Sequence, residues 1–198
     1  PYYYLGSMVL IEEEEECLRI IDGQQRMATT QIVTSRIMHR LFQYDPKDNA
    51  IMRYLNYLQH EDSGGRTRDT LVLNDTDRDF FNKHVIQRQP LPDRRSISVV
   101  SHAAVADAID TVDEFIQQEL QLVETREKLK EFLSTLVLFI NRRLAVLRVI
   151  CRDLDLGYTL FRSLNARGKD LSPVDLIRNH ILEKTASDPS TIDMWQSA

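Results

Sequence analysis

The sequence predicts an α+β protein, and three observations support this class. Apolar runs typical of strands occupy residues 3–11, 17–21 and 144–151. Between and after them, apolar residues recur at helical spacing over several long stretches. The chain has 198 residues, of which 42% are hydrophobic. That length and composition are enough for one domain with a core, or for one large and one small lobe.

The first elements are two strands and a long helix. Residues 3–11 are apolar and aromatic, interrupted only by Gly6-Ser7, and residues 17–21 form the return strand. The five acids of Glu12–Glu16 between them predict a solvated hairpin tip; a metal site there would need His or Asp neighbours, which are absent. The helix runs from Gln24 to just before Asp45-Pro46, because the residue before a proline avoids the α region. Its predicted apolar face holds Ala28, Ile32, Val33, Ile37 and Leu41.

The middle of the chain is predicted to be mainly helical. We expect a short helix at 51–58, a polar loop at 60–69 and a short strand at 71–73. Asn74 then opens a helix that continues through Val85. Residues 87–98 form a loop with three arginines, Arg88, Arg94 and Arg95. These either keep an exposed loop soluble or contact a phosphate backbone.

Two further amphipathic helices lead to the last strand. Their apolar positions extend from Val105 to Leu120 and from Leu129 to Ile140. The strand at 144–151 is followed by a helix that starts near Asp155. Asn165–Leu171 is a polar loop in which Gly168 allows positive φ, and Ser172-Pro173 begins a final helix.

Composition and charge argue against several classes of protein. The net charge is -5, so any contact with nucleic acid must be local or come from another segment. No apolar stretch approaches the ~20 residues of a membrane span, and no signal peptide pattern is visible. Cys17 and Cys151 are predicted to be buried thiols in a reducing compartment, which favours a cytoplasmic protein. Both ends of the chain are expected to be cuts.

Well-known catalytic motifs are absent from the sequence. There is no P-loop, no G-x-G-x-x-G and no paired Cys-x-x-Cys. The histidines His39, His60, His84, His102 and His180 follow no metal-ligand or HNH nuclease spacing, so we interpret them as surface or packing residues.

The most informative run is Asp22-Gly23-Gln24-Gln25-Arg26. Asp-Gly is a turn signal, and here it joins a strand to the N-terminus of a helix. Backbone N–H groups at such a terminus attract anions, above all phosphate. A plain turn needs only Asp-Gly, so the two amides and the arginine suggest a polar site.

Two motifs carry a resemblance to a known family. Ile21–Arg26, after the Leu-Gly-Ser-Met-Val-Leu strand, resembles the signature of the N-terminal domain of GmrSD-type restriction endonucleases. Phe161–Ser172 resembles the second signature, Phe-x-x-x-Asn-x-x-Gly-x-x-Leu-Ser, and Asp175–Asn179 matches its continuation. Leu73–Asp77 fits a weaker landmark between them. The motifs occur in the family's order along almost the whole chain.

The resemblance implies a ParB/sulfiredoxin-like core, which is a small mixed sheet flanked by helices. In this interpretation the chain is one domain, with the sheet and first helix in 1–45, a mainly helical insertion in 46–143 and the second motif in 144–198. An upstream segment with a Pro-x-Tyr-Gln-Arg motif and a C-terminal HNH nuclease domain would lie outside it. The implied function is a nucleotide-binding, NTP-hydrolysing regulatory domain of a DNA-targeting, modification-dependent system for anti-phage defence.

The residues of the implied site follow from the two motifs. Arg26 would neutralise phosphate oxygens of GTP or ATP, Asp22 would bind Mg²⁺ or orient a water, and Gln24 and Gln25 would position water or ribose. Gly23, in the turn at the helix start, would take part in nucleotide binding. If the motifs meet, Asn165, Arg167, Gly168 and Lys169 would form a second wall. The implied partners are nucleotide, DNA and the HNH nuclease domain or subunit, without a membrane; a homo-oligomer stays open.

Two alternatives stay open beside this interpretation. The first is a ParB-like nucleotide- or DNA-binding switch without catalysis. The second is structural: Arg26 pairs with Asp22 and caps the helix, and the Asn-x-x-Gly loop is only a tight turn.

Overall fold

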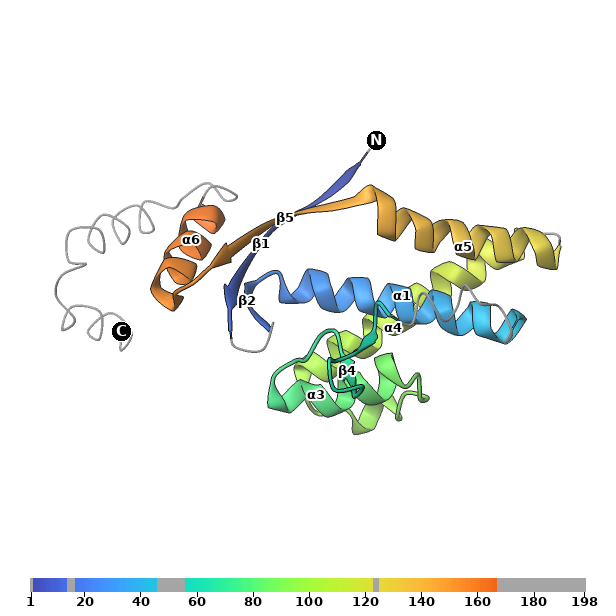
Figure 1. Cartoon of the computed structure of the whole chain (residues 1–198). Coiled ribbons are helices and arrows are strands. Elements are labelled where there is room, and N and C mark those ends of the chain that lie inside the picture. Colours follow the sequence, from blue (N-terminus) through green and yellow to red (C-terminus); the bar gives the residue numbers. More distant parts are fainter. Residues whose placement is uncertain (1, 14–16, 46–55, 123–124, 167–198) are drawn as a thin grey trace. The chain divides into compact units, whose positions relative to one another are not determined.

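The computed structural model describes residues 2–13, 17–45, 56–122 and 125–166 (Figure 1). It confirms the α+β class. A three-stranded sheet has the strand order β2-β1-β5, and β3 and β4 form a separate two-stranded sheet. The elements are β1 (Tyr3–Glu12), β2 (Leu18–Asp22), α1 (Gln24–Tyr44), β3 (Gln59–Glu61), β4 (Thr67–Asp69), α3 (Asp75–Phe81), η1 (Asn82–Ile86), η2 (Arg94–Ser96), α4 (Val100–Gln121), α5 (Arg126–Arg143), β5 (Leu144–Cys151) and α6 (Leu154–Ala166).

Contacts divide the chain into two units. The first, which we call the helical unit, contains residues 1–6 and 23–147, and the second, the strand unit, contains residues 7–22 and 148–198. The boundary crosses the Asp22–Arg26 motif: Asp22 belongs to the strand unit and Gly23 begins the helical unit.

The helical unit is built around α1, which packs against α4, α5 and η1. The predicted helix at 24–44 is confirmed, and Figure 1 shows α4 and α5 beside it. Its buried aliphatic residues contribute roughly 1.5–3 kcal/mol each relative to an exposed position. The buried hydrophobic residues of α1, α3, η1, α4 and α5 are Ile32, Ile37, Met38, Leu41, Phe81, Val85, Ile86, Ala106, Ile109, Ile116, Leu129, Leu133 and Val137.

Two buried polar side chains of α1 donate hydrogen bonds to other segments, while Gln31 Oε1 has no partner among the described residues. Ser35 is fully buried and its hydroxyl donates to the carbonyl of Val85, which ties α1 to η1. Gln31 Nε2 donates to Thr70 Oγ1 at 2.6 Å. Because an unpaired buried polar group costs free energy, these two bonds fix which segments can lie against α1.

The strand unit contains the β1–β2 hairpin. The strands are antiparallel, with Leu10 opposite Ile20 and Val9 opposite Asp22, and the register shifts between Val9 and Leu10. Val9, Ile11 and Cys151 form a small core, against which Ile21, Val149 and Leu160 pack. In α6, Gly157 lies so close to this core that an added Cβ would be 3.1 Å from Ile11 Cδ1.

Several predicted elements are confirmed with small changes. The strands at 3–11, 17–21 and 144–151 correspond to β1, β2 and β5. Asn74 caps α3 through its side chain, which accepts from the Asp77 N–H at 3.0 Å. The predicted helix through Val85 changes after Phe81 into the π-helical turn η1. Residues 87–98 are a loop, apart from the 3₁₀ turn at Arg94–Ser96.

The strand predicted at 71–73 is wrong. The strands lie instead at 59–61 and 67–69, inside the segment that we predicted to be a polar loop. Local side chains make this hairpin: Asp62 Oδ1 accepts from the N–H groups of Gly64 and Arg66, each at 2.9 Å, and Gly65 has φ 72°. Because the hairpin depends on local polar contacts, its two strands show no alternation of apolar residues by which the sequence could predict them.

Two other expectations are corrected or limited. Cys151 is buried at the end of β5, but Cys17 is exposed, because it lies at the turn end of the hairpin, where its carbonyl accepts from the Glu13 N–H. Of the helix predicted at 51–58, residues 51–55 lie outside the described residues and 56–58 form a turn.

Candidate functional site

Gly23 forms the turn between β2 and α1. Its φ of 102° and ψ of 5° lie in the left-handed region, and it is buried. The Met27 N–H donates to the Gly23 carbonyl at 3.0 Å, which is the first hydrogen bond of the helix. A side chain at this position would add strain on the order of 1–2 kcal/mol, so the turn requires glycine. The predicted Asp-Gly turn is therefore confirmed.

The N-terminus of α1 suits an anion. Gly23 provides no side-chain cap, and the first turn contains no acidic residue. The positive end of the helix dipole is thus not offset by a carboxylate from that turn. Gln24 and Gln25, the two amides of the motif, are exposed at this end of the helix.

Arg26 lies against Gly6, a residue of β1 that belongs to the helical unit. A Cβ added to Gly6 would be 3.4 Å from Arg26 Nε and 3.5 Å from its Cζ. Gly6 itself has φ 108°, a conformation that other residues rarely adopt. The strand backbone at Gly6 therefore gives room to the guanidinium, and Arg26 is half-buried beside it.

Gly6 is a site residue that the sequence argument missed. Its signal was present, because a glycine inside an apolar strand often marks a close approach of another group. The structure brings together Gly6, Gly23 and Arg26, which come from two segments of the chain.

Asp22 is the last residue of β2 and is half-buried. It directly precedes Gly23 in the chain and belongs to the strand unit. Among the described residues, no group of three or more His, Cys, Asp and Glu side chains could hold a metal ion. Mg²⁺ often takes only one or two carboxylates together with substrate phosphates and waters, so a single aspartate is compatible with it.

The second motif is described only at its start. Asn165 lies in the last turn of α6, which extends to Ala166, so these two residues are helical where we predicted a loop. Arg167, Gly168 and Lys169 lie outside the described residues. The meeting of the two motifs stays a prediction.

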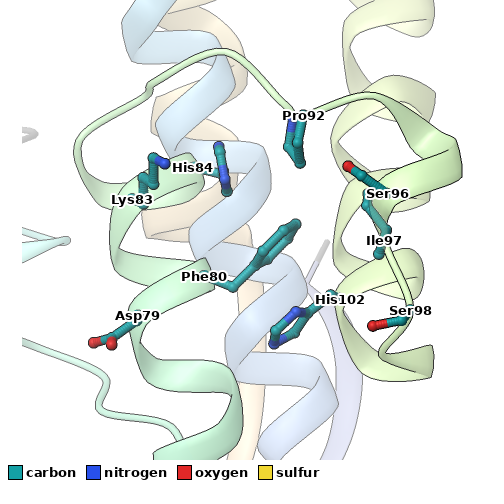
Figure 2. Close-up of a pocket in the computed structure, with 9 residues that line it drawn as sticks. All are labelled: Asp79, Phe80, Lys83, His84, Pro92, Ser96, Ile97, Ser98 and His102. Carbon is teal, nitrogen blue, oxygen red and sulfur yellow. The ribbon is translucent and has the colours of Figure 1, made fainter.

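A separate pocket of about 400 Å³ lies in the helical unit, between α3, η1, the following loop and the start of α4 (Figure 2). Phe80 is in contact with two histidine rings. Its ring stacks on the His102 ring, with 4.3 Å between the ring centroids, and is tilted against the His84 ring, with 4.5 Å between the centroids. The other lining residues are Asp79, Lys83, Pro92, Ser96, Ile97 and Ser98.

Both histidines of this pocket hold the fold together. His102 Nε2 donates to the Thr76 carbonyl at 3.0 Å, and His84 Nδ1 donates to the Gln89 carbonyl at 3.2 Å. These bonds fix the start of α4 to α3 and the loop to η1. The two rings are thus packing residues, as the sequence predicts for the scattered histidines.

No helix in the described ranges is both long and apolar enough to cross a membrane.

Comparison with protein families identifies the family to which the sequence is similar. A family model described as the N-terminal domain of GmrSD restriction endonuclease matches residues 1–182. The search of curated proteins finds no match.

Proposed function

Because the chain belongs to the family of GmrSD restriction endonuclease N-terminal domains, which gives it a role in a restriction system, we propose that it binds and hydrolyses a nucleoside triphosphate as a regulatory domain. The observation that carries the proposal is the position of Arg26. Its guanidinium lies over Gly6, one helical turn from the Gly23 N-cap. One cation and one helix N-terminus are thereby placed at the same end of α1.

Phosphate binding is the chemistry that this arrangement supports. A guanidinium presents its donors in a planar fork that matches two phosphate oxygens, and N–H groups at a helix start bind anions. Half-burial of Arg26 removes part of the competing water, which strengthens both interactions. In hydrolysis, the same groups would stabilise the charge that develops on the transferred phosphoryl group.

The neighbouring polar residues take the other roles. Gln24 and Gln25 are exposed at the helix start, where an amide can orient a water or a ribose hydroxyl. Asp22 provides the one carboxylate of the motif, which suits Mg²⁺ bound jointly with phosphate oxygens. In this proposal DNA and an HNH nuclease domain or subunit are the partners, and nucleotide occupancy controls their action.

Phosphate release from GTP and ATP tests the proposal. Arg26→Ala should lower the turnover rate about 100-fold, as expected when one preorganised donor to a developing charge is removed. Arg19→Ala is the matched control, because Arg19 is an exposed arginine of β2 that is paired with Glu13. Equal rates for wild type and Arg26→Ala would contradict the assignment.

Gln25→Ala separates catalysis from binding. If Gln25 positions the attacking water, its loss should lower the turnover rate while nucleotide affinity changes little. Nucleotide affinity without any turnover in the wild type would instead favour the non-catalytic, ParB-like switch. Absence of nucleotide binding would contradict the proposed function and would leave the switch only in its DNA-binding form.

A further inference from the structure

Four basic side chains of the helical unit form a second group, which we call the α1 basic cluster: Arg36, His39, Arg40 and Arg88. The first three lie three and four residues apart on α1 and therefore share one face of the helix. Arg88 follows η1, and the hydrogen bond from Ser35 to the Val85 carbonyl holds η1 against α1. Burial, followed by the charges of Arg36, Arg88 and Arg40, lowers the pKa of His39.

One acid faces this cluster among the described residues. Asp113 of α4 accepts two hydrogen bonds from Arg36, from Nε to Oδ1 at 2.8 Å and from Nη2 to Oδ2 at 2.6 Å. Its two carboxylate oxygens are thus both used by one guanidinium. The charge of Asp113 also acts on His39, whose pKa it raises, while the charge of Arg36 lowers the pKa of Arg88. Three arginines and one aspartate leave a local surplus of positive charge in a chain whose net charge is -5.

Arg40 is incompletely hydrogen-bonded. Its Nε is buried and has no hydrogen-bond partner among the residues that the structure describes. Its Nη1 donates to Gln43 Oε1 at the long distance of 3.4 Å, while Gln43 Nε2 donates to His39 Nε2 at 3.0 Å. Buried polar groups in folded proteins nearly always have partners, so an unsatisfied guanidinium nitrogen calls for an explanation.

Arg88 is held in an unfavourable state. Its φ of 58° makes it the one residue other than glycine with positive φ among those described. It is half-buried, and burial together with the charge of Arg36 lowers its pKa. Its guanidinium has no ion pair within the described ranges, whereas Arg94 of the same loop pairs with Asp107 and Asp110. A strained backbone that holds a half-buried cation beside another cation is typical of a functional site.

We propose that the α1 basic cluster binds a phosphate group. Arg40 and Arg88 supply the donors, and Arg36, fixed by Asp113, supplies additional positive potential. Guanidinium groups bind phosphate with two parallel hydrogen bonds, and an incoming dianion or diester would be bound by the outer nitrogens of the half-buried Arg40 and would offset the charge around Arg88. Arg36 follows Arg26 by ten residues, about 15 Å along the helix. The cluster is therefore a site separate from the α1 N-terminus and does not depend on the function proposed there.

Two sources could provide this phosphate: the backbone of nucleic acid or a free nucleotide. The first arm of the test measures the affinity of a fluorescein-labelled DNA duplex by anisotropy at several salt concentrations. The second arm titrates pyrophosphate and follows the thermal unfolding midpoint. Each arm compares wild type with Arg88→Asn, because asparagine tolerates positive φ and keeps the turn while removing the charge.

Arg95→Asn is the matched control. Arg95 is an exposed arginine of the same loop, and it lies outside the cluster. Arg40→Gln is the second cluster variant, and it leaves the backbone at Arg88 unchanged. Thermal unfolding without ligand identifies any variant that fails to fold, and the other then carries the test.

For a nucleic-acid source, Arg88→Asn and Arg40→Gln should each weaken duplex binding about 10-fold and reduce the salt slope by about one, while Arg95→Asn changes affinity less than about twofold. For a nucleotide source, measured in an Arg26→Ala background so that the α1 N-terminus does not contribute, the pyrophosphate-induced rise in unfolding midpoint should be lost in both cluster variants and kept in Arg95→Asn. Cluster variants that match Arg95→Asn in both arms would overturn the proposal. Because Arg26→Ala leaves the cluster intact, these results are independent of the outcome at the α1 N-terminus.

Discussion

Replacing Asp113 with alanine should lower the free energy of unfolding by about 3–5 kcal/mol, which is the cost of leaving one partner of a buried ion pair unpaired. The side chains of Arg36 and Asp113 are only 12% and 24% exposed. Two charge-assisted hydrogen bonds join them, each worth about 1.5–3 kcal/mol. The loss should lie near the upper end, since Arg36 would then face Arg40 and Arg88 without a counter-charge.

Urea unfolding of a double-mutant cycle measures this. Asp113→Leu combined with Arg36→Met should recover most of the lost stability, because a buried pair replaced by apolar side chains of similar volume is often neutral. The pair Arg78–Asp75, whose side chains are 53% and 94% exposed, is the control; Asp75→Ala should cost less than about 1 kcal/mol. A loss below about 1 kcal/mol for Asp113→Ala would refute the reasoning.

Three further predictions follow from single contacts. Gly6→Ala should lower the free energy of unfolding by about 1–3 kcal/mol in urea, because φ 108° is strained for alanine. It should also weaken nucleotide binding by displacing Arg26. Unchanged stability and affinity would contradict the contact between Gly6 and Arg26. The pKa of His39 is lowered from 6.5, mainly by burial, so the unfolded state binds more protons than the folded state. The free energy of unfolding should therefore fall as pH drops below about 7. His39→Gln should flatten this pH dependence, and an unchanged slope would count against the role of His39. Gly157→Val should lower the free energy of unfolding by about 1–3 kcal/mol, because its Cβ would lie 3.1 Å from Ile11 Cδ1. The control Thr159→Val, at an exposed position of α6, should unfold at nearly the wild-type temperature. Equal unfolding midpoints for both variants would argue against close packing of Gly157 on Ile11.

Apolar pattern was sufficient for most of the fold. The strands β1, β2 and β5 and the helices α1, α4 and α5 follow from it, because their apolar residues form continuous runs or recur at helical spacing. The β3–β4 hairpin did not follow, since Asp62 makes it with local polar hydrogen bonds. The predicted burial of Cys17 was wrong, because Cys17 lies in the hairpin turn and the strand β2 begins only at Leu18.

The candidate site was only partly predictable. The Asp22–Arg26 motif showed the turn and the helix start, because a short run of chain determines both. Gly6 was missed, since only the folded chain brings that strand position under Arg26. The α1 basic cluster was likewise missed: the loop arginines looked equivalent in sequence, and the structure separates Arg88, which approaches α1, from Arg94, which is neutralised by α4.

The most direct test of the central claim is an equilibrium titration of a fluorescent GTP or ATP analogue onto wild type, Arg26→Ala and Arg19→Ala. If Arg26 and the start of α1 hold the phosphates, Arg26→Ala should bind at least about 10-fold more weakly, because a charge-assisted contact is lost. Arg19→Ala should bind like wild type. Equal affinities for all three proteins would show that phosphate is not bound at Arg26 and would contradict the account.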